Sequence, residues 1–216
     1  MIIVGGGIVG ASFAYHAHLR GVSVITQITG TLSTNKEQAT SNTWGWVNGY
    51  ASNDKKYAAF RLANLKYWSK LIVDIKHLTN SSKGAFFWDM DKDDLSETIA
   101  QHQSWGHSVS DVIKLRLEEY LPNLHNRPEI AGFGENDLAI EGSKAADILI
   151  KASGSQIKKS NVNKLVLKEN KVIGVKTDQG IIYSDEVIIA AGLGTPELLS
   201  TININFKMSS TLGLLA

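Results

Sequence analysis

The stretch "VGGGIVGAS", residues 4 to 12, places three glycines at the GxGxxG spacing of a dinucleotide-binding turn. An apolar run at residues 1 to 4 precedes the turn, and apolar residues then recur at helical spacing until Gly21 ends the pattern. "VSVIT", residues 22 to 26, predicts a second strand. A GxGxxG turn between a strand and a helix favours a dinucleotide site over the alternative, a turn that serves chain geometry alone.

Each glycine of this turn has its own physical purpose. Gly5 permits the tight turn, Gly7 lets the backbone approach a pyrophosphate, and Gly10 lets the helix pack close to the strand. The phosphates would then lie on the amides at the start of the helix, at Ile8 and Val9, where the helix dipole favours negative charge.

The second strand lacks the acidic residue that usually accepts hydrogen bonds from a ribose, about 20 residues after such a turn. That place reads "TQITG", residues 26 to 30. Either the amide of Gln27 holds the ribose, or the following loop folds back and supplies the carboxylate of Glu37. The sequence favours Gln27. No arginine follows the strand to meet a 2′-phosphate, so the lost acid does not indicate NADP.

The composition is that of an ordinary globular protein. The 216 residues, 43% hydrophobic and 20% charged, are enough to bury a sizeable core. A net charge of +1 gives no field that would gather nucleic acid or anionic lipid, and no apolar run reaches membrane-spanning length. The absence of cysteine excludes disulfides and thiolate chemistry. Because the start of the chain does not read as a leader, we expect a cytoplasmic protein with a small-molecule partner.

The stretch "EQATSNTWGWVNG", residues 37 to 49, adds a second motif. Together with the glycine turn it resembles the FAD-dependent oxidoreductases of the D-amino-acid oxidase and glycine oxidase type. The resemblance implies that the segment at Gly45 and Trp46 passes close to the isoalloxazine ring of FAD. The residues alone also predict a buried aromatic cluster of Trp44 and Trp46, and the two interpretations can hold together. The residues that the resemblance places against the FAD diphosphate are Ala39, Thr40 and Ser41.

The stretch "VNKLVLKENKVIGVKTDQGIIYSDEVIIAAG", residues 162 to 192, extends the resemblance. Short alternating strands are broken by "KEN" and "DQG", and an apolar strand then ends in glycine, which is similar to the β-meander and closing strand of such flavoproteins. The resemblance implies that the backbone of Val162 contacts the adenine. The small residues that would let the closing strand approach the cofactor are Ala190, Ala191 and Gly192. The family often has an aromatic residue where this chain has Gly194.

The implied fold is α/β: a Rossmann-like FAD-binding domain with a parallel core sheet and a β-meander, plus part of an interleaved α+β substrate-binding domain. We expect residues 1–80 and 143–216 to form the FAD-binding domain, truncated at its C-terminus, and residues 81–142 to form the partial substrate-binding domain. Ser143 is a plausible N-cap for the helix that returns the chain to the first domain. The other predicted elements are helices at residues 54–79, 94–104 and 111–121 and a strand at residues 84–90.

The acidic run "DMDKDD", residues 89 to 94, does not fit a calcium loop. Its sixth position is Asp94 where the loop needs glycine, and its twelfth is Ala100 where it needs a bidentate Glu. We expect an acidic helix start instead, with Asp94 as the cap. Pairs of histidines lie two or five residues apart and do not share a helix face, so a metal site is not predicted.

The resemblance implies an oxidoreductase that acts on the C–N bond of an amino acid or a secondary amine, by hydride transfer to FAD with an imine as product. The cofactor performs the redox step in such enzymes, so we assign no catalytic residue. The alternatives are a truncated FAD-binding module without catalysis and one chain of a split flavoenzyme that a second chain completes. The β-meander argues against an NAD-dependent dehydrogenase.

Overall fold

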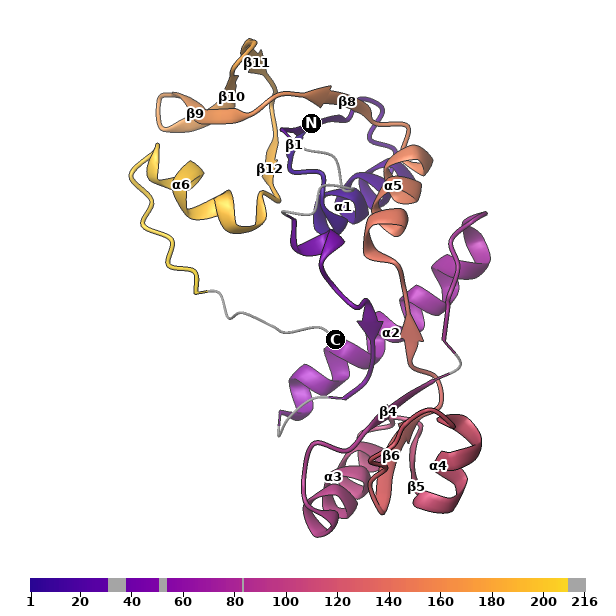
Figure 1. Cartoon of the computed structure of the whole chain (residues 1–216). Coiled ribbons are helices and arrows are strands. Elements are labelled where there is room, and N and C mark those ends of the chain that lie inside the picture. The colour runs from indigo at the N-terminus through magenta and orange to yellow at the C-terminus, as the bar shows by residue number, and fades with distance from the viewer. Residues whose placement is uncertain (31–37, 51–53, 83, 210–216) are drawn as a thin grey trace. The chain divides into compact units, whose positions relative to one another are not determined.

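The chain forms two units, and the first of them brings together its N-terminal and C-terminal segments (Figure 1). Unit 1 comprises Met1–Trp44 and Glu141–Ala216, and unit 2 comprises Gly45–Ile140. The residues that the computed structural model describes are 1–30, 38–50, 54–82 and 84–209.

Unit 1 is built on a four-stranded parallel sheet in the order β12-β1-β2-β8. The central strand β1 is buried along its whole length, as expected for a parallel strand that is covered on both faces. This sheet confirms the predicted Rossmann-like α/β class. Its strands are β1 (Ile2–Val4), β2 (Thr26–Thr29), β8 (Gln156–Lys159) and β12 (Val187–Ile189).

Strand β2 begins later than the sequence predicts. The expected strand at residues 22 to 26 is replaced by one that starts at Thr26, and Val24 is 59% exposed. The partner sets this register, because β1 has three residues and pairs from Ile2↔Thr26 to Val4↔Ile28. The shift brings the "TQIT" residues into the sheet itself, which changes what they can contact.

Two helices pack against each other on one face of this sheet, α1 (Ile8–Leu19) and α5 (Gly142–Ala152) (Figure 1). In α1, Ala14 and Ala17 pack with Ile3 of the sheet, and small side chains permit this close approach. The larger apolar residues of the predicted pattern are not in the core, since Val9 is 67% and Phe13 42% exposed.

The predicted β-meander covers the other face of the sheet. Its strands are β9 (Val162–Lys168), β10 (Lys171–Thr177) and β11 (Gly180–Tyr183), which pair in antiparallel fashion in the order β11-β10-β9. Leu165 and Val175 pack with Ile2 and Ile28 of the sheet and with Leu198 of α6 (Thr195–Ser200). The "KEN" turn has the expected left-handed geometry, with φ of 50° at Glu169 and 61° at Asn170.

Unit 2 contains a separate antiparallel sheet in the order β4-β6-β5, with a core of apolar residues from the sheet and α3. A two-stranded pair, β3 with β7, and the long helix α2 complete the unit. Its elements are β3 (Trp46–Val47), α2 (Lys55–Asp74), β4 (Ala85–Phe87), α3 (Lys92–Ser104), β5 (Val109–Ile113), α4 (Lys114–Tyr120), β6 (Ile130–Gly134) and β7 (Leu138–Ala139).

Local predictions in and near unit 2 need three corrections. The helix expected at residues 111–121 is a strand, β5, followed by the shorter helix α4, because residues 109 to 113 pair with β6. The N-cap of α3 is Asp91, one turn before Asp94, and Asp94 lies in the first turn. Helix α5 has Glu141 as its N-cap rather than Ser143.

Segment 45–80, expected in the FAD-binding domain, lies in unit 2. It packs there because β3 pairs with β7 and because Gly49 lies against Leu62 and His107. Within the described ranges, no helix combines the length and apolar character needed to cross a membrane.

Candidate functional site

The glycine turn lies between β1 and α1, where the end of β12 approaches it closely. Gly5 has φ of +120°, and a Cβ atom there would lie 2.1 Å from the carbonyl oxygen of Ala190. The backbone on either side is held by the sheet, since the amide of Gly5 donates to the carbonyl of Ile28 at 2.9 Å and that of Ala190 donates to Val4 at 2.8 Å. Only glycine fits this position.

The short helix η1 (Ala39–Ser41) brings a hydroxyl group to the start of α1. Thr40 Oγ1 accepts a hydrogen bond from the amide of Ile8 at 3.0 Å, and no side chain of α1's own N-cap, Gly7, can do so. A Cβ atom on Gly7 would lie 2.9 Å from the same oxygen. Two segments that the sequence assigned to the diphosphate therefore meet at one helix N-terminus, which carries the positive end of the helix dipole.

Gln27 has a different place from the one predicted. Its side chain is fully buried, and Nε2 donates to the carbonyl oxygen of Gly5 at 2.8 Å. Gly10 leaves the room for this contact, because a Cβ there would lie 2.3 Å from the Gly5 oxygen and 3.2 Å from Gln27 Nε2. Gln27 thus supports the turn from beneath, and a ribose at the surface has no access to its amide in this conformation.

Two neutral side chains lie beside the glycines at the carboxyl end of β2. A Cβ atom on Gly6 would lie 2.9 Å from Thr29 Oγ1, and one on Gly30 would lie 1.9 Å from Oδ1 of the exposed Asn161. The alternative donor of a carboxylate, Glu37, lies outside the described residues. The sequence did not point to Asn161, because only the pairing of β2 with β8 brings it beside Gly30.

Asn161 also connects this edge to the β-meander. Its amide donates to Oδ2 of Asp178 at 3.2 Å, and Nδ2 of Asn163 donates to Oδ1 of Asp178 at 2.7 Å. The hydrogen bond from Asn163, together with those from Asn161, holds the pKa of the Asp178 carboxyl below its usual value, although desolvation acts in the opposite direction. Val162, the predicted adenine contact, follows directly as the first residue of β9.

Strand β12, the predicted closing strand, ends beside open space. Ala191 follows Ala190 and precedes the short helix η2 (Gly192–Gly194). Gly192 has φ of +56°, and a Cβ atom there would have nothing within 4 Å. The room beside Gly192 is compatible with the predicted approach of a nucleotide, and the left-handed φ explains the glycine.

Gly45 and Trp46, the predicted flavin-ring segment, begin unit 2. Gly45 has φ of +68°, and a Cβ atom there would lie 1.8 Å from the carbonyl oxygen of Ile140. Trp46 packs beside the core of unit 2 and stacks on Tyr50, with ring centroids 6.4 Å apart. Trp44 is 69% exposed, so the prediction of a buried cluster of both tryptophans is wrong.

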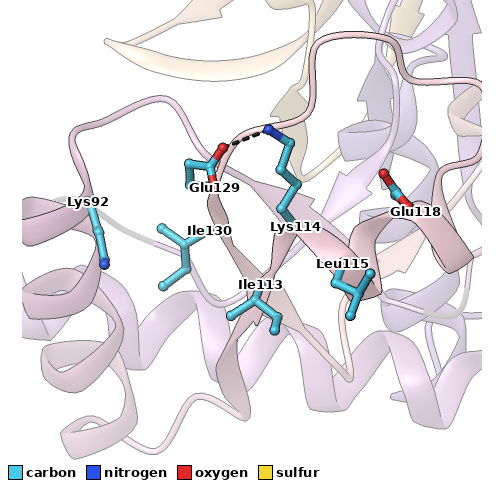
Figure 2. Close-up of a pocket in the computed structure, with 7 residues that line it drawn as sticks. All are labelled: Lys92, Ile113, Lys114, Leu115, Glu118, Glu129 and Ile130. Atoms are coloured by element: carbon cyan, nitrogen blue, oxygen red, sulfur yellow. Dashed lines mark hydrogen bonds and ion pairs between the residues drawn. The ribbon is translucent and has the colours of Figure 1, made fainter.

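A surface hollow in unit 2 is shown in Figure 2. Its charged side chains are of both signs, and Lys114 Nζ forms an ion pair with Glu129 Oε1 at 2.7 Å. None of its residues belongs to the predicted site, so we assign it no function. The residues that line the hollow are Lys92, Ile113, Lys114, Leu115, Glu118, Glu129 and Ile130.

Among the described residues no group of His, Asp and Glu is arranged to hold a metal ion.

Comparison with known proteins identifies a family for nearly the whole chain. A family model described as FAD dependent oxidoreductase matches residues 1–212. The 4-methylaminobutanoate oxidase (formaldehyde-forming) of Paenarthrobacter nicotinovorans is 28% identical, over 96% of this chain and 26% of that protein. The uncharacterized oxidoreductase YurR of Bacillus subtilis (strain 168) is 27% identical, over 96% of this chain and 59% of that protein.

The fold is also similar to that of solved structures. L-proline dehydrogenase from P. horikoshii superposes with a TM-score of 0.84 and 19% sequence identity, over 96% of this chain and 56% of that one. The chain therefore spans between about a quarter and three fifths of the length of the relatives it matches.

Proposed function

Because the chain belongs to the FAD-dependent oxidoreductase family, we propose that it forms part of a flavoenzyme that oxidises the C–N bond of an amino acid or a secondary amine. The substrate class is supported by two relatives whose names specify an N-methylated amino acid and L-proline, both of which carry a secondary amine and a carboxylate. FAD, when bound, accepts the hydride from the substrate carbon beside the nitrogen.

One observation carries the proposal: the hydroxyl of Thr40 lies on the first amide of α1, directly over Gly7. This arrangement fits a diphosphate, which needs donors at a helix N-terminus and a backbone without side chains beside it. Gly7 and the amide of Val9 would hold the diphosphate, and Ile8, whose amide donates to Thr40 Oγ1, would border it together with Ala39, Thr40 and Ser41. Gly5 and Gly10 would shape the turn.

At the other end of the cofactor, we assign the adenosine to the edge where β2, β8 and β9 meet. Asn161 is exposed there beside Gly30, so its carboxamide would take the place of the missing acid toward the ribose. Val162 would contact the adenine through its backbone. The small residues at the end of β12, Ala190, Ala191 and Gly192, would border the cofactor.

The alternative is an FAD-binding module that needs a further segment or a second chain for turnover. The chain spans 59% of the length of the oxidoreductase from Bacillus subtilis. The substrate would then be oxidised only by the longer or two-chain protein, and the chain alone would bind FAD without consuming amines.

The first experiment is the visible absorption spectrum of the desalted chain before and after addition of FAD. Flavin bands that remain with the protein support FAD binding, and a screen of glycine, D-amino acids, proline and N-methylated amino acids then separates the enzyme from the module. A chain that retains no flavin would contradict the assignment of the site.

Gly7→Val tests the position of the diphosphate. Its side chain would collide with Thr40 Oγ1, which a Cβ alone approaches to 2.9 Å, so flavin binding should be lost while the far-UV circular dichroism stays native. Ala152→Val adds a valine at the exposed end of α5 and serves as the matched control. Flavin retained by Gly7→Val at the wild-type level would show that the diphosphate lies elsewhere.

A further inference from the structure

A buried carboxylate in unit 2 has three hydrogen-bond partners from two separate segments. Asp137 lies between β6 and β7, and its side chain is fully buried. His107 Nε2 lies 3.0 Å from Oδ1, the indole Nε1 of Trp46 donates to Oδ2 at 3.0 Å, and the amide of Gly49 donates to Oδ1 at 3.4 Å. A carboxylate removed from water is tolerated only with such partners.

Two glycines make the room that this pair of side chains occupies. A Cβ atom on Gly134 would lie 2.5 Å from Asp137 Oδ2, and one on Gly49 would lie 2.7 Å from Cδ2 of His107. The imidazole is as buried as the carboxylate, with 1% of its side chain exposed. Backbone and side chains on both sides therefore accommodate the Asp137–His107 pair, which no sequence motif indicated.

The strand pairing of the segment that the pair holds is short. β3 contains two residues and pairs only through Trp46↔Ala139 and Val47↔Leu138. Asp137 binds both ends of Trp46–Gly49, and Arg61 donates to the backbone carbonyl of Asn48 at 3.3 Å and to its side-chain oxygen. Side-chain hydrogen bonds thus add to a short strand ladder in fixing where this segment lies.

We propose that Asp137, oriented by His107, is a positioning residue that fixes the Trp46–Gly49 segment beside the flavin ring. The inference rests on the proposed function, because only the family resemblance assigns Trp46, with Gly45, to the isoalloxazine. Asp137 itself does not touch the cofactor. Its loss should release the Trp46 indole and the Gly49 amide, and so change the surroundings of the flavin while the diphosphate contacts of unit 1 remain.

The first measurement concerns the chain without FAD. Hydrogen exchange of the Trp46 indole N–H, assigned with Trp46→Phe, should be faster in Asp137→Ala by about tenfold, the expected effect of a lost hydrogen bond to a charged group. His107→Leu should show part of this change, whereas His107→Gln, which retains a donor, should restore the slow exchange. Asp111→Asn, at an exposed carboxylate of β5, is the matched control. Unchanged exchange in Asp137→Ala overturns the inference.

The second measurement uses the same variants with FAD. Asp137→Asn is included because it keeps an acceptor for the indole and is less prone to unfold. Asp137→Ala and Trp46→Phe should both shift the flavin absorption bands and change the dissociation constant for FAD by less than about threefold. Unshifted bands in Asp137→Ala overturn the positioning role. If the wild-type chain itself takes up no FAD, the proposed function fails. The exchange measurement needs no FAD, so it still tests whether Asp137 holds Trp46.

Discussion

Thr40 shows how one hydroxyl can cap a helix from a distant part of the sequence. The N-cap of helix α1 is Gly7, which has no side chain to cap the helix, and the oxygen that accepts from the Ile8 amide comes from η1. The capping group is therefore also the group that covers the proposed diphosphate position. Stability of the helix and affinity for the cofactor should both depend on it.

Thr40→Val should lower the free energy of unfolding by about 1 kcal/mol, the usual effect of removing a helix cap. Urea denaturation followed by circular dichroism measures this, and an FAD titration should show weaker binding in the same variant. Thr40→Ser keeps the hydroxyl and should stay close to the wild type in both measurements. Equal behaviour of the two variants would contradict the capping role.

Gln27→Glu separates two interpretations with opposite outcomes. If Gln27 holds the ribose, a carboxylate there should strengthen FAD binding, as an acid does in other such turns. If Gln27 supports Gly5, a buried carboxylate would face the Gly5 carbonyl oxygen, and the free energy of unfolding should fall by about 2 kcal/mol or more. We expect the second result. Gln156→Glu, the same change at an exposed position of β8, should be nearly neutral.

At the scale of elements, the β-meander is tied to the edge of the parallel sheet by one carboxylate. Asp178, in the turn between β10 and β11, accepts from Asn163 and from the amide of Asn161, which follows β8. The two sheets of unit 1 thus share a polar connection beside their common apolar core. The same connection positions Asn161, which we assign to the ribose.

The lowered pKa of Asp178 gives this connection a pH dependence. Because the folded state binds the proton less readily than the unfolded chain, the stabilisation is complete above the usual pKa of 3.8 and is lost as the pH falls through the folded-state pKa. The difference in unfolding free energy between wild type and Asp178→Asn should be constant above about pH 5 and shrink below about pH 4. Denaturation at a series of pH values measures it, and a difference that grows on acidification would contradict the sign.

Asn163→Ala removes the strongest donor to Asp178 and leaves the carboxylate in place. Its stability at neutral pH should lie between those of the wild type and Asp178→Asn, because the hydrogen bonds from Asn161 still lower the pKa of Asp178.

At the scale of the whole molecule, the cofactor contacts assigned to unit 1 come from both ends of the sequence. Bound FAD should therefore slow amide hydrogen exchange in residues 5–10 and 190–192 together. The three-stranded sheet of unit 2 should change least. Mass spectrometry of peptides from exchanged samples, with and without FAD, measures this. Protection confined to the β4-β6-β5 sheet would contradict the assignment.

Local sequence signals predicted more of this fold than of the site. The glycine turn and the "KEN" turn depend on backbone conformations that few residues adopt, and both lie where expected. The start of β2 could not be predicted, because residues 22–26 and 26–29 both suit a strand and only pairing with β1 decides between them. Asn161 and Asp137 were missed for a related reason: each acts through partners that are distant in sequence and carries no motif of its own.

The close approach of Gly5 and Ala190 also has a consequence for the order in which the sheet of unit 1 forms during synthesis. β1 is made first, yet its neighbour β12 pairs through Ile2↔Val187, after all of unit 2 has been synthesised. Such long-range pairing forms late, because the loop it closes is long. On the ribosome, the glycine turn therefore forms beside a sheet edge that has no partner strand yet, and the proposed nucleotide site is complete only once residues 190–192 have emerged.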